Sequence, residues 1–226
     1  MTTHVFTAAP GIRLHATAIG IPLRPAITGL DRPALRGAAR QRFGLRSGEP
    51  VLLVTGGSQG AWAINAAVLG ASGALRAAGV QVLHITGPQH VFRVPDGDPA
   101  GPPYVAIPYV DDMRYAYAAA DFALCRSGAM TCAELAAVGL PAAYVPLRGG
   151  EQRLNAEPAV AAGGALLVGD GRLDPAWIEA TLIPVLTDPG RIAAMPARAL
   201  AAGARNADIV ARHVLTAIAE GRGFAS

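Results

Sequence analysis

The chain has 226 residues, of which 52% are hydrophobic, so it can form one large domain or two small ones with a substantial core. Its net charge is only +3, and its basic residues, all arginines, are scattered rather than gathered in a block, which argues against a nucleic-acid surface. Its two cysteines have no CxxC spacing and no neighbouring histidine pair, which argues against a disulfide framework and a zinc site and favours a reducing compartment.

The first 46 residues differ from the rest of the chain. Prolines at positions 10, 22, 25 and 33 interrupt any periodic pattern, as is typical of an interdomain connection. A short helix is predicted at 35–43, ending at Gly44. We therefore expect a linker segment with a short helix at 1–46, a ligand-binding domain at 47–205, and a C-terminal helix and tail at 206–226.

From position 50 onward, apolar runs alternate regularly with helical stretches. This alternation predicts an α/β fold with a doubly wound parallel sheet, Rossmann-like, and right-handed crossovers. The predicted strands are 51–55, 80–85, 104–107, 122–125, 142–145 and 165–168. The predicted helices run from the turn at 56–60 to about 78, then over 112–120 with Asp111 as the cap, 129–138, 153–162, 175–186, 191–202 and 206–219.

The stretch 121–135, DFALCRSGAMTCAEL, predicts a buried strand, a glycine turn and a helix that begins near Ala129. The start of such a helix presents unpaired backbone N–H groups and the positive end of its dipole. At the carboxyl end of a parallel strand this is typical of a phosphate or diphosphate site. Glu134, one turn inside the helix, is placed to accept hydrogen bonds from a sugar diol. The alternative is an ordinary strand–turn–helix with a solvated glutamate.

A second glycine-rich turn, GGSQG at 56–60, follows the first regular strand. Its glycines let the backbone approach a ligand closely, and Ser58 adds a hydroxyl donor. The turn is neither a P-loop, because the lysine is absent, nor a dinucleotide fingerprint, because the spacing differs. A tight turn that only begins a helix, without contacting a ligand, is an equally good interpretation of GGSQG.

Polar residues in two further places could contact a sugar nucleotide. In GGEQRLNA, at 149–156, the amides of Gln152 and Asn155 can donate and accept, and Glu151 can accept, which suits sugar hydroxyls. Arg24 in GIPLR could clamp a diphosphate. Considered singly, each set is as expected for an ordinary surface loop.

The remaining candidates for chemistry favour structural roles. Both Cys125 and Cys132 are expected to be buried small residues rather than nucleophiles. No two histidines have metal-ligand spacing, so we predict neither a metal nor a cofactor. The histidines are His4, His15, His84, His90 and His213.

No apolar stretch approaches the roughly 18 residues that a membrane span needs, and we expect no signal peptide. We expect a cytoplasmic protein that meets a membrane only at its surface, on the inner face of the plasma membrane, or through a partner. The predicted last helix carries an apolar stripe that could cover a partner domain, a second copy as a homodimer, or its own sheet.

Several motifs occur together in the chain, namely GIPLR, GGSQGA, YVDDM, CRSGAMTCAEL followed by GLPA, and EQRLNA. In order and spacing they closely resemble the motifs of the MurG family of transferases, which make lipid II of peptidoglycan. The resemblance covers essentially the whole chain. It implies the C-terminal, donor-binding half of a GT-B glycosyltransferase, and UDP-N-acetylglucosamine as donor. It also implies transfer to a lipid-linked muramoyl pentapeptide without a metal.

At the positions where the motifs match, the resemblance implies roles for residues around the diphosphate. Arg24 and Ser58 would contact the diphosphate or the sugar. Ala129, Met130 and Thr131 would hold the diphosphate at the start of the helix.

The same resemblance assigns residues to the uracil, the ribose and the sugar of the donor. Val110 would meet the uracil through its backbone, Glu134 the ribose hydroxyls, and Glu151 and Gln152 the sugar. No catalytic residue is identified in this chain, and the general base is expected in an acceptor domain that the sequence does not include. The loop at 146–152 is about two residues shorter than is usual in the family, which leaves the donor sugar open.

Three functional hypotheses follow from the sequence. In the first, the chain is a donor half-enzyme that works with a separate acceptor-domain protein, for lipid II or for another glycoconjugate or natural product. Alternatively, it is a domain of a full transferase. The third hypothesis is a non-catalytic protein that binds nucleotide sugars. In the first two, the lipid-linked acceptor is reached only through the acceptor domain, and no hypothesis involves nucleic acid.

Overall fold

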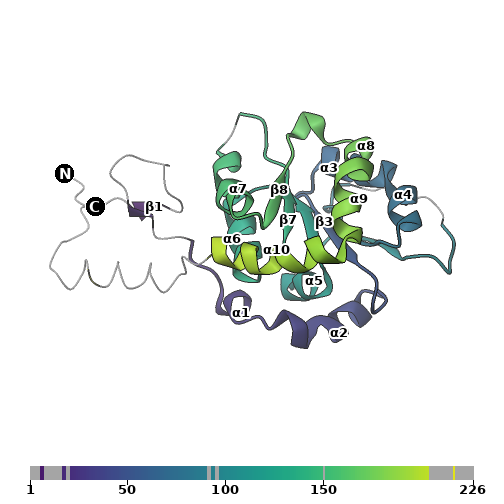
Figure 1. The fold of residues 1–226 in the computed structure, drawn as a ribbon, viewed down its shortest axis with the longest axis horizontal. Helices are drawn as coiled ribbons and strands as arrows, with labels where there is room; N and C mark the ends of the chain where they lie inside the picture. Colours follow the sequence, from purple (N-terminus) through teal and green to yellow (C-terminus); the bar gives the residue numbers. More distant parts are fainter. Residues whose placement is uncertain are drawn as a thin grey trace.

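The computed structural model describes residues 6–7, 17–18, 21–90, 93–94, 97–149, 151–203 and 216. Six strands in this part form one parallel sheet in the order β5-β4-β3-β6-β7-β8, which confirms the predicted doubly wound fold (Figure 1). Strands β1 (Phe6–Thr7) and β2 (Thr17–Ala18) form a separate parallel pair. The strands of the large sheet are β3 (Val51–Thr55), β4 (Gln81–Ile85), β5 (Tyr104–Ile107), β6 (Phe122–Cys125), β7 (Ala142–Tyr144) and β8 (Ala165–Leu167).

The strand order places the topological switch point between β3 and β6. From β3 the chain continues outward to β4 and β5, and from β6 it continues in the opposite direction to β7 and β8. Thr55 and Cys125, the last residues of β3 and β6, are paired in register. In open α/β sheets, ligands bind outside the carboxyl ends of the strands at this reversal.

Helices cover both faces of the sheet and enclose two hydrophobic cores (Figure 1). Alternate residues of β3 enter the two cores, Leu53 with α2, α5 and α6, and Leu52 with α3, α4, α9 and α10. The helices are α1 (Pro25–Thr28), α2 (Arg32–Arg42), α3 (Trp62–Gly70), α4 (Ser72–Ala77), α5 (Met113–Ala119), α6 (Ala129–Ala137), α7 (Gln152–Ala161), η1 (Asp170–Arg172), α8 (Pro175–Trp177), η2 (Ile178–Leu182), α9 (Ile183–Thr187) and α10 (Pro189–Ala202).

Several predicted helices differ in detail from the observed ones, and the stretch expected as one helix at 175–186 is divided into α8, η2 and α9. The helix expected up to residue 78 is broken at Ala71 into α3 and α4. A Cβ at Gly70 would lie 2.6 Å from Pro175 Cγ, so the break falls where α8 packs closely on the chain. Asp112 rather than Asp111 caps α5, its Oδ1 accepting from Arg114 N at 3.1 Å. The helix expected at 206–219 lies outside the described residues except for Thr216, which is helical.

The short helix expected at 35–43 is α2, which begins earlier because Asp31 caps it, accepting from Ala34 N at 3.0 Å. It packs on α5 beside the sheet. The boundaries proposed at 47 and 206 for the ligand-binding domain stay predictions.

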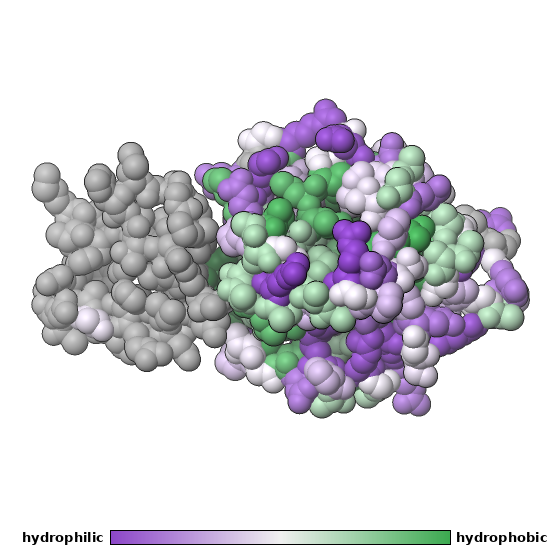
Figure 2. All heavy atoms as spheres, in the orientation of Figure 1, coloured by the Kyte–Doolittle hydropathy of each residue, from purple (hydrophilic) through white to green (hydrophobic). Residues whose placement is uncertain are grey.

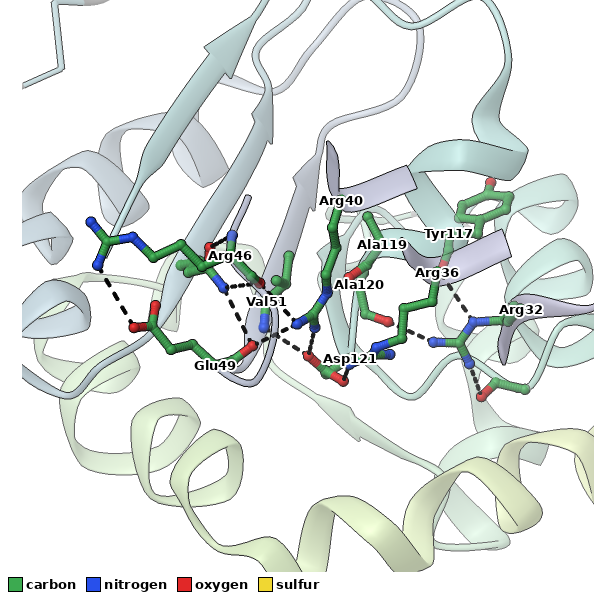
Figure 3. A network of polar contacts seen from close by, with 12 residues as sticks. Arg32, Arg36, Arg40, Arg46, Glu49, Val51, Tyr117, Ala119, Ala120 and Asp121 are labelled. Atoms are coloured by element: carbon green, nitrogen blue, oxygen red, sulfur yellow. Dashed lines mark hydrogen bonds and ion pairs between the residues drawn. The ribbon is translucent and has the colours of Figure 1, made fainter. Parts of the chain in front are cut away.

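Polar contacts tie α2 to the amino-terminal edge of the sheet (Figure 3). Arg40 on α2, with a side chain only 5% exposed, donates to Asp121 Oδ2 at 2.8 Å. The same carboxylate oxygen accepts from Val51 N at 2.8 Å, and Arg36 pairs with Oδ1. Asp121, the residue before β6, thereby joins α2 to the starts of β3 and β6.

A third arginine of α2 joins two helices at their carboxyl ends (Figure 3). Arg32 donates from Nε to Tyr117 O at 3.0 Å and from Nη2 to Ala120 O at 2.6 Å, where α5 ends. Its Nη1 donates to Gly139 O at 2.8 Å, just beyond α6. A cation at helix carboxyl termini satisfies orphan carbonyls and opposes the helix dipoles.

The surface of the described part mixes polar and apolar groups. Figure 2 shows hydrophobic residues, in green, interrupted by hydrophilic ones, in purple, on the face that α10 crosses. Within the described residues, no helix combines the length and the apolar character that crossing a bilayer requires.

We predict that Asp121→Ala lowers the free energy of unfolding by about 3 kcal/mol, because it leaves the buried Arg40 guanidinium without its anionic partner. Urea denaturation measures the loss. The matched control is Glu157→Ala, which breaks the exposed pair with Arg153 and should cost less than about 0.5 kcal/mol. Equal losses in the two variants would show that the Asp121 carboxylate does not hold α2 to the sheet.

Candidate functional site

Two turns meet at the carboxyl ends of the central strands. GGSQG, residues 56–60, follows β3, and the turn Arg126–Gly128 follows β6. Because β3 and β6 are hydrogen-bonded neighbours that end in register, the two turns emerge side by side. The two glycine turns singled out in the sequence therefore belong to one edge of the sheet.

The turn after β3 is fixed by close backbone packing. Gly57 and Gly60 have φ angles of 90° and 77°, which L-residues rarely adopt. A Cβ at Gly60 would collide with the carbonyl oxygen of Thr86, so this turn packs directly on the turn after β4. Ser58 lies on the exposed side of the turn. Its hydroxyl is thus presented to solvent from a constrained backbone.

The turn after β6 leads into a helix with an open amino terminus. Gly128 occupies the cap position with extended backbone angles, φ −62° and ψ 146°, and no side chain caps α6. The N–H groups of Ala129, Met130 and Thr131 belong to the first turn, whose donors have no acceptor within the helix. Ala129 and Met130 are exposed. The first turn of α6 is therefore accessible to an anion.

Hydrogen bonds and an ion pair with neighbouring residues hold the turn after β6 in place. Asn155 Nδ2, on α7, donates to Ser127 O at 3.0 Å, so at least one hydrogen of the amide predicted to meet a sugar is used within the protein. Ser127 is fully buried, and its Oγ has no hydrogen-bond partner among the described residues. Arg126 pairs with Asp170 and donates to Val145 O at 3.2 Å, which joins the ends of β6 and β7.

A buried carboxylate lies one turn inside α6. Glu134, 8% exposed, accepts from the hydroxyl of Tyr117 at 2.6 Å through Oε2. Burial and the adjacent carboxylate raise the pKa of Tyr117, so the phenol stays protonated and donates. Arg24 approaches the other oxygen, with Nη2 3.9 Å from Oε1. The structure thus brings together two predicted residues, Arg24 and Glu134, and adds Tyr117, which the sequence did not indicate.

The other predicted residues flank α6 on both sides along the same edge. Val110 is buried in the loop after β5, two strands from β3. Beyond β7, Glu151 is exposed and Gln152 is the first residue of α7. Gln152 Oε1 accepts from Leu147 N at 3.2 Å, which ties α7 to the loop before it. Within the described part of the chain, none of these residues forms a hydrogen bond or an ion pair with Glu134.

A buried hydrogen-bonded chain supports the turn after β4. Asn65 Nδ2 donates to Thr86 O at 2.9 Å, so Asn65 Oδ1 is left to accept from His84 Nε2, also at 2.9 Å. His84 Nδ1 then accepts from Tyr104 Oη at 2.7 Å. This arrangement requires a neutral imidazole, and burial lowers the pKa of His84 to about 4. His84 is therefore a buried core residue.

The cysteines are also core residues, as expected. Both Cys125 and Cys132 are buried, and burial raises the pKa of each thiol, which disfavours the reactive thiolate. Among the described residues, no group of three or more histidine, cysteine or acidic side chains could hold a metal ion.

The comparisons with known proteins begin with a family profile. The profile of the glycosyltransferase family 28 C-terminal domain matches residues 51–212. This range contains the two glycine turns and Glu134.

Two curated relatives carry the same name, UDP-N-acetylglucosamine–N-acetylmuramyl-(pentapeptide) pyrophosphoryl-undecaprenol N-acetylglucosamine transferase. The relative from Thermobifida fusca is 52% identical over 98% of this chain. The relative from Rhodococcus opacus is 55% identical over 93% of it. The chain spans 59% and 56% of the lengths of these relatives.

Solved structures show the same fold. A crystal structure of MurG from Acinetobacter baumannii superimposes with a TM-score of 0.76 at 25% identity, covering 96% of this chain and 60% of that one. The glycosyltransferase VinC superimposes with a TM-score of 0.57 at 18% identity, covering 91% of this chain and 46% of that one, and shares the fold alone.

We predict that stability falls as the pH drops from about 6.5 to about 4. In this window the unfolded chain protonates His84, whose ordinary pKa is 6.5, whereas the folded protein with its lowered pKa does not. The contribution of the neutral His84 to the free energy of unfolding is complete above the pKa that His84 has in the unfolded chain. About 3 kcal/mol of it is lost when the pH has fallen to the pKa that His84 has in the folded protein. Urea denaturation at several pH values measures this slope.

His84→Gln should flatten that part of the slope, and His90→Gln, a change on the turn after β4, should leave it intact. Identical slopes in wild type and His84→Gln would contradict the neutral, buried imidazole.

Proposed function

Because the chain belongs to the family of glycosyltransferase family 28 C-terminal domains, we propose that it binds UDP-N-acetylglucosamine as the donor part of an inverting glycosyltransferase. The acceptor of the complete enzyme would be a lipid-linked muramoyl pentapeptide. The names of the relatives from Thermobifida fusca and Rhodococcus opacus support this donor and acceptor. The lipid-linked acceptor further suggests work at the inner face of the plasma membrane.

The observation that carries the proposal is the uncapped start of α6 beside a buried, oriented carboxylate. Three N–H groups and the positive end of the helix dipole suit the diphosphate. Glu134, one turn further along, suits the ribose hydroxyls because a carboxylate only accepts hydrogen bonds. An adjacent diphosphate and ribose are the central parts of a nucleotide sugar.

The remaining assignments follow the order of the groups along the donor. Val110 would meet the uracil on the β5 side of α6, and Glu151 and Gln152 would meet the sugar on the β7 side. Ser58 would contact the diphosphate or the sugar from the turn after β3. Arg24 would add a positive charge at the diphosphate.

In the proposed reaction the acceptor hydroxyl attacks the anomeric carbon while the bond to UDP breaks. Negative charge grows on the departing diphosphate, so the N–H groups of α6 and Arg24 stabilise the transition state more than the bound donor. The attacking hydroxyl must also lose its proton to a general base. We assign no such base to the described residues and place it in an acceptor domain or subunit.

We predict that the chain binds UDP, UDP-N-acetylglucosamine and UDP-glucose, and that Glu134→Ala weakens all three about tenfold by removing the acceptor of the ribose hydroxyls. Isothermal titration calorimetry measures the affinities. Glu179→Ala, an exposed glutamate on η2, is the control and should bind as wild type does. Absence of binding, or unchanged affinity in Glu134→Ala, would refute the assignment.

We predict that this chain alone transfers little or no N-acetylglucosamine to a lipid-linked acceptor, because it lacks an assigned base. Release of UDP in the presence of acceptor measures the rate, and adding a separately produced acceptor domain should raise it. Rapid transfer by the chain alone would place the base within it. Tight binding of a sugar nucleotide other than UDP-N-acetylglucosamine would favour a donor subunit for another glycoconjugate.

A further inference from the structure

We propose that Tyr117 is a positioning residue for Glu134 and thereby determines the preference of this site for ribonucleotides over 2′-deoxyribonucleotides. The inference rests on the proposed function, because it concerns the carboxylate assigned there to the ribose. Tyr117 belongs to α5, whereas the proposed donor contacts on α6 begin at the turn after β6.

The hydrogen bond between the two side chains leaves the carboxylate with a defined orientation. Tyr117 is 3% exposed, and its hydroxyl uses one acceptor position on Oε2 of Glu134, at 2.6 Å. Each carboxylate oxygen has two acceptor positions, so one on Oε2 and both on Oε1 remain. Two neighbouring hydroxyls of a ribose can therefore each find an oxygen on a carboxylate whose rotation is already fixed.

Without the Tyr117 hydroxyl, Arg24 would be the remaining polar partner that the structure places near this carboxylate, 3.9 Å from Oε1. A guanidinium prefers to bind a carboxylate through two parallel hydrogen bonds, one to each oxygen. Such a pair would occupy the positions that a diol needs. The phenol thus holds Glu134 in an orientation that leaves it available to ligand.

The backbone below this pair is held as well. Arg32 bonds the carbonyls of Tyr117 and Ala120 on α5 and of Gly139 after α6, at 3.0, 2.6 and 2.8 Å. The phenol and the carboxylate are therefore carried on two helices that one guanidinium ties together. Groups fixed before binding lose less conformational entropy when the ligand arrives.

The test compares UDP with 2′-deoxyuridine diphosphate by calorimetry, on wild type and on Tyr117→Phe. Wild type should prefer UDP. Tyr117→Phe should weaken UDP binding about tenfold and 2′-deoxyuridine diphosphate binding much less, so that the preference largely disappears. Tyr115→Phe is the matched control, because Tyr115 lies on the same helix with its ring under Arg42 at 4.6 Å, and it should keep the wild-type preference.

An unchanged preference in Tyr117→Phe would overturn the inference, as would a wild type that binds UDP without preferring it, and either result would leave binding of a uridine nucleotide standing. A wild type that binds neither nucleotide would refute the proposed function and the inference with it. Circular dichroism checks that each variant is folded. If Tyr117→Phe does not fold, proton NMR of the wild type decides, because the Tyr117 hydroxyl proton should stay at low field when UDP binds, and its loss would overturn the inference.

Discussion

The guanidinium of Arg32 fixes the relation between the two helices on which the candidate site depends. It donates to carbonyls at the ends of both α5 and α6, and burial together with the neighbouring Arg36 lowers the pKa of Arg32 to about 10, still well above neutrality. The arginine remains charged, so it stabilises the carboxyl ends of both helix dipoles. A residue far from the ligand edge thereby aligns the helix that carries Tyr117 with the helix that carries Glu134.

The sheet determines where that aligned pair is used. Because β3 and β6 are adjacent and the chain diverges from them in opposite directions, the turns that follow lie at the topological switch point, the region in which open α/β sheets bind ligands. Backbone amides are well suited to a diphosphate in that region, since their position is fixed by the helix and they need no counterion of their own. The network around Asp121 acts at the opposite edge, where it secures the starts of β3 and β6.

The sequence was informative where the signal is local. The strands β3, β5 and β6 were predicted with their observed bounds because they are short apolar runs between turn residues, and the open start of α6 followed from a glycine turn after a buried strand. The resemblance to the MurG family, carried by several motifs in order, is confirmed by the relatives and the family profile. Contacts between distant segments gave no local signal. Tyr117 has the spacing of an ordinary apolar helix residue, and nothing near Asn155 indicates that its amide holds the carbonyl of Ser127.

The residues proposed to contact the donor near α6 suit donor binding better than they suit deprotonation of an acceptor. The groups proposed to act on the leaving diphosphate are N–H donors and one exposed arginine, and none of them accepts a proton. The one buried carboxylate that the structure describes close by, Glu134, already accepts a hydrogen bond from the phenol of Tyr117 and is flanked by Arg24. On the proposed function, this site therefore suits donor binding and leaving-group stabilisation, while deprotonation of the acceptor needs a group from the acceptor domain or subunit. On the proposed function, donor affinity should for this reason depend on residues of α5 and α6, whereas the transfer rate should also depend on the acceptor domain or subunit that supplies the base.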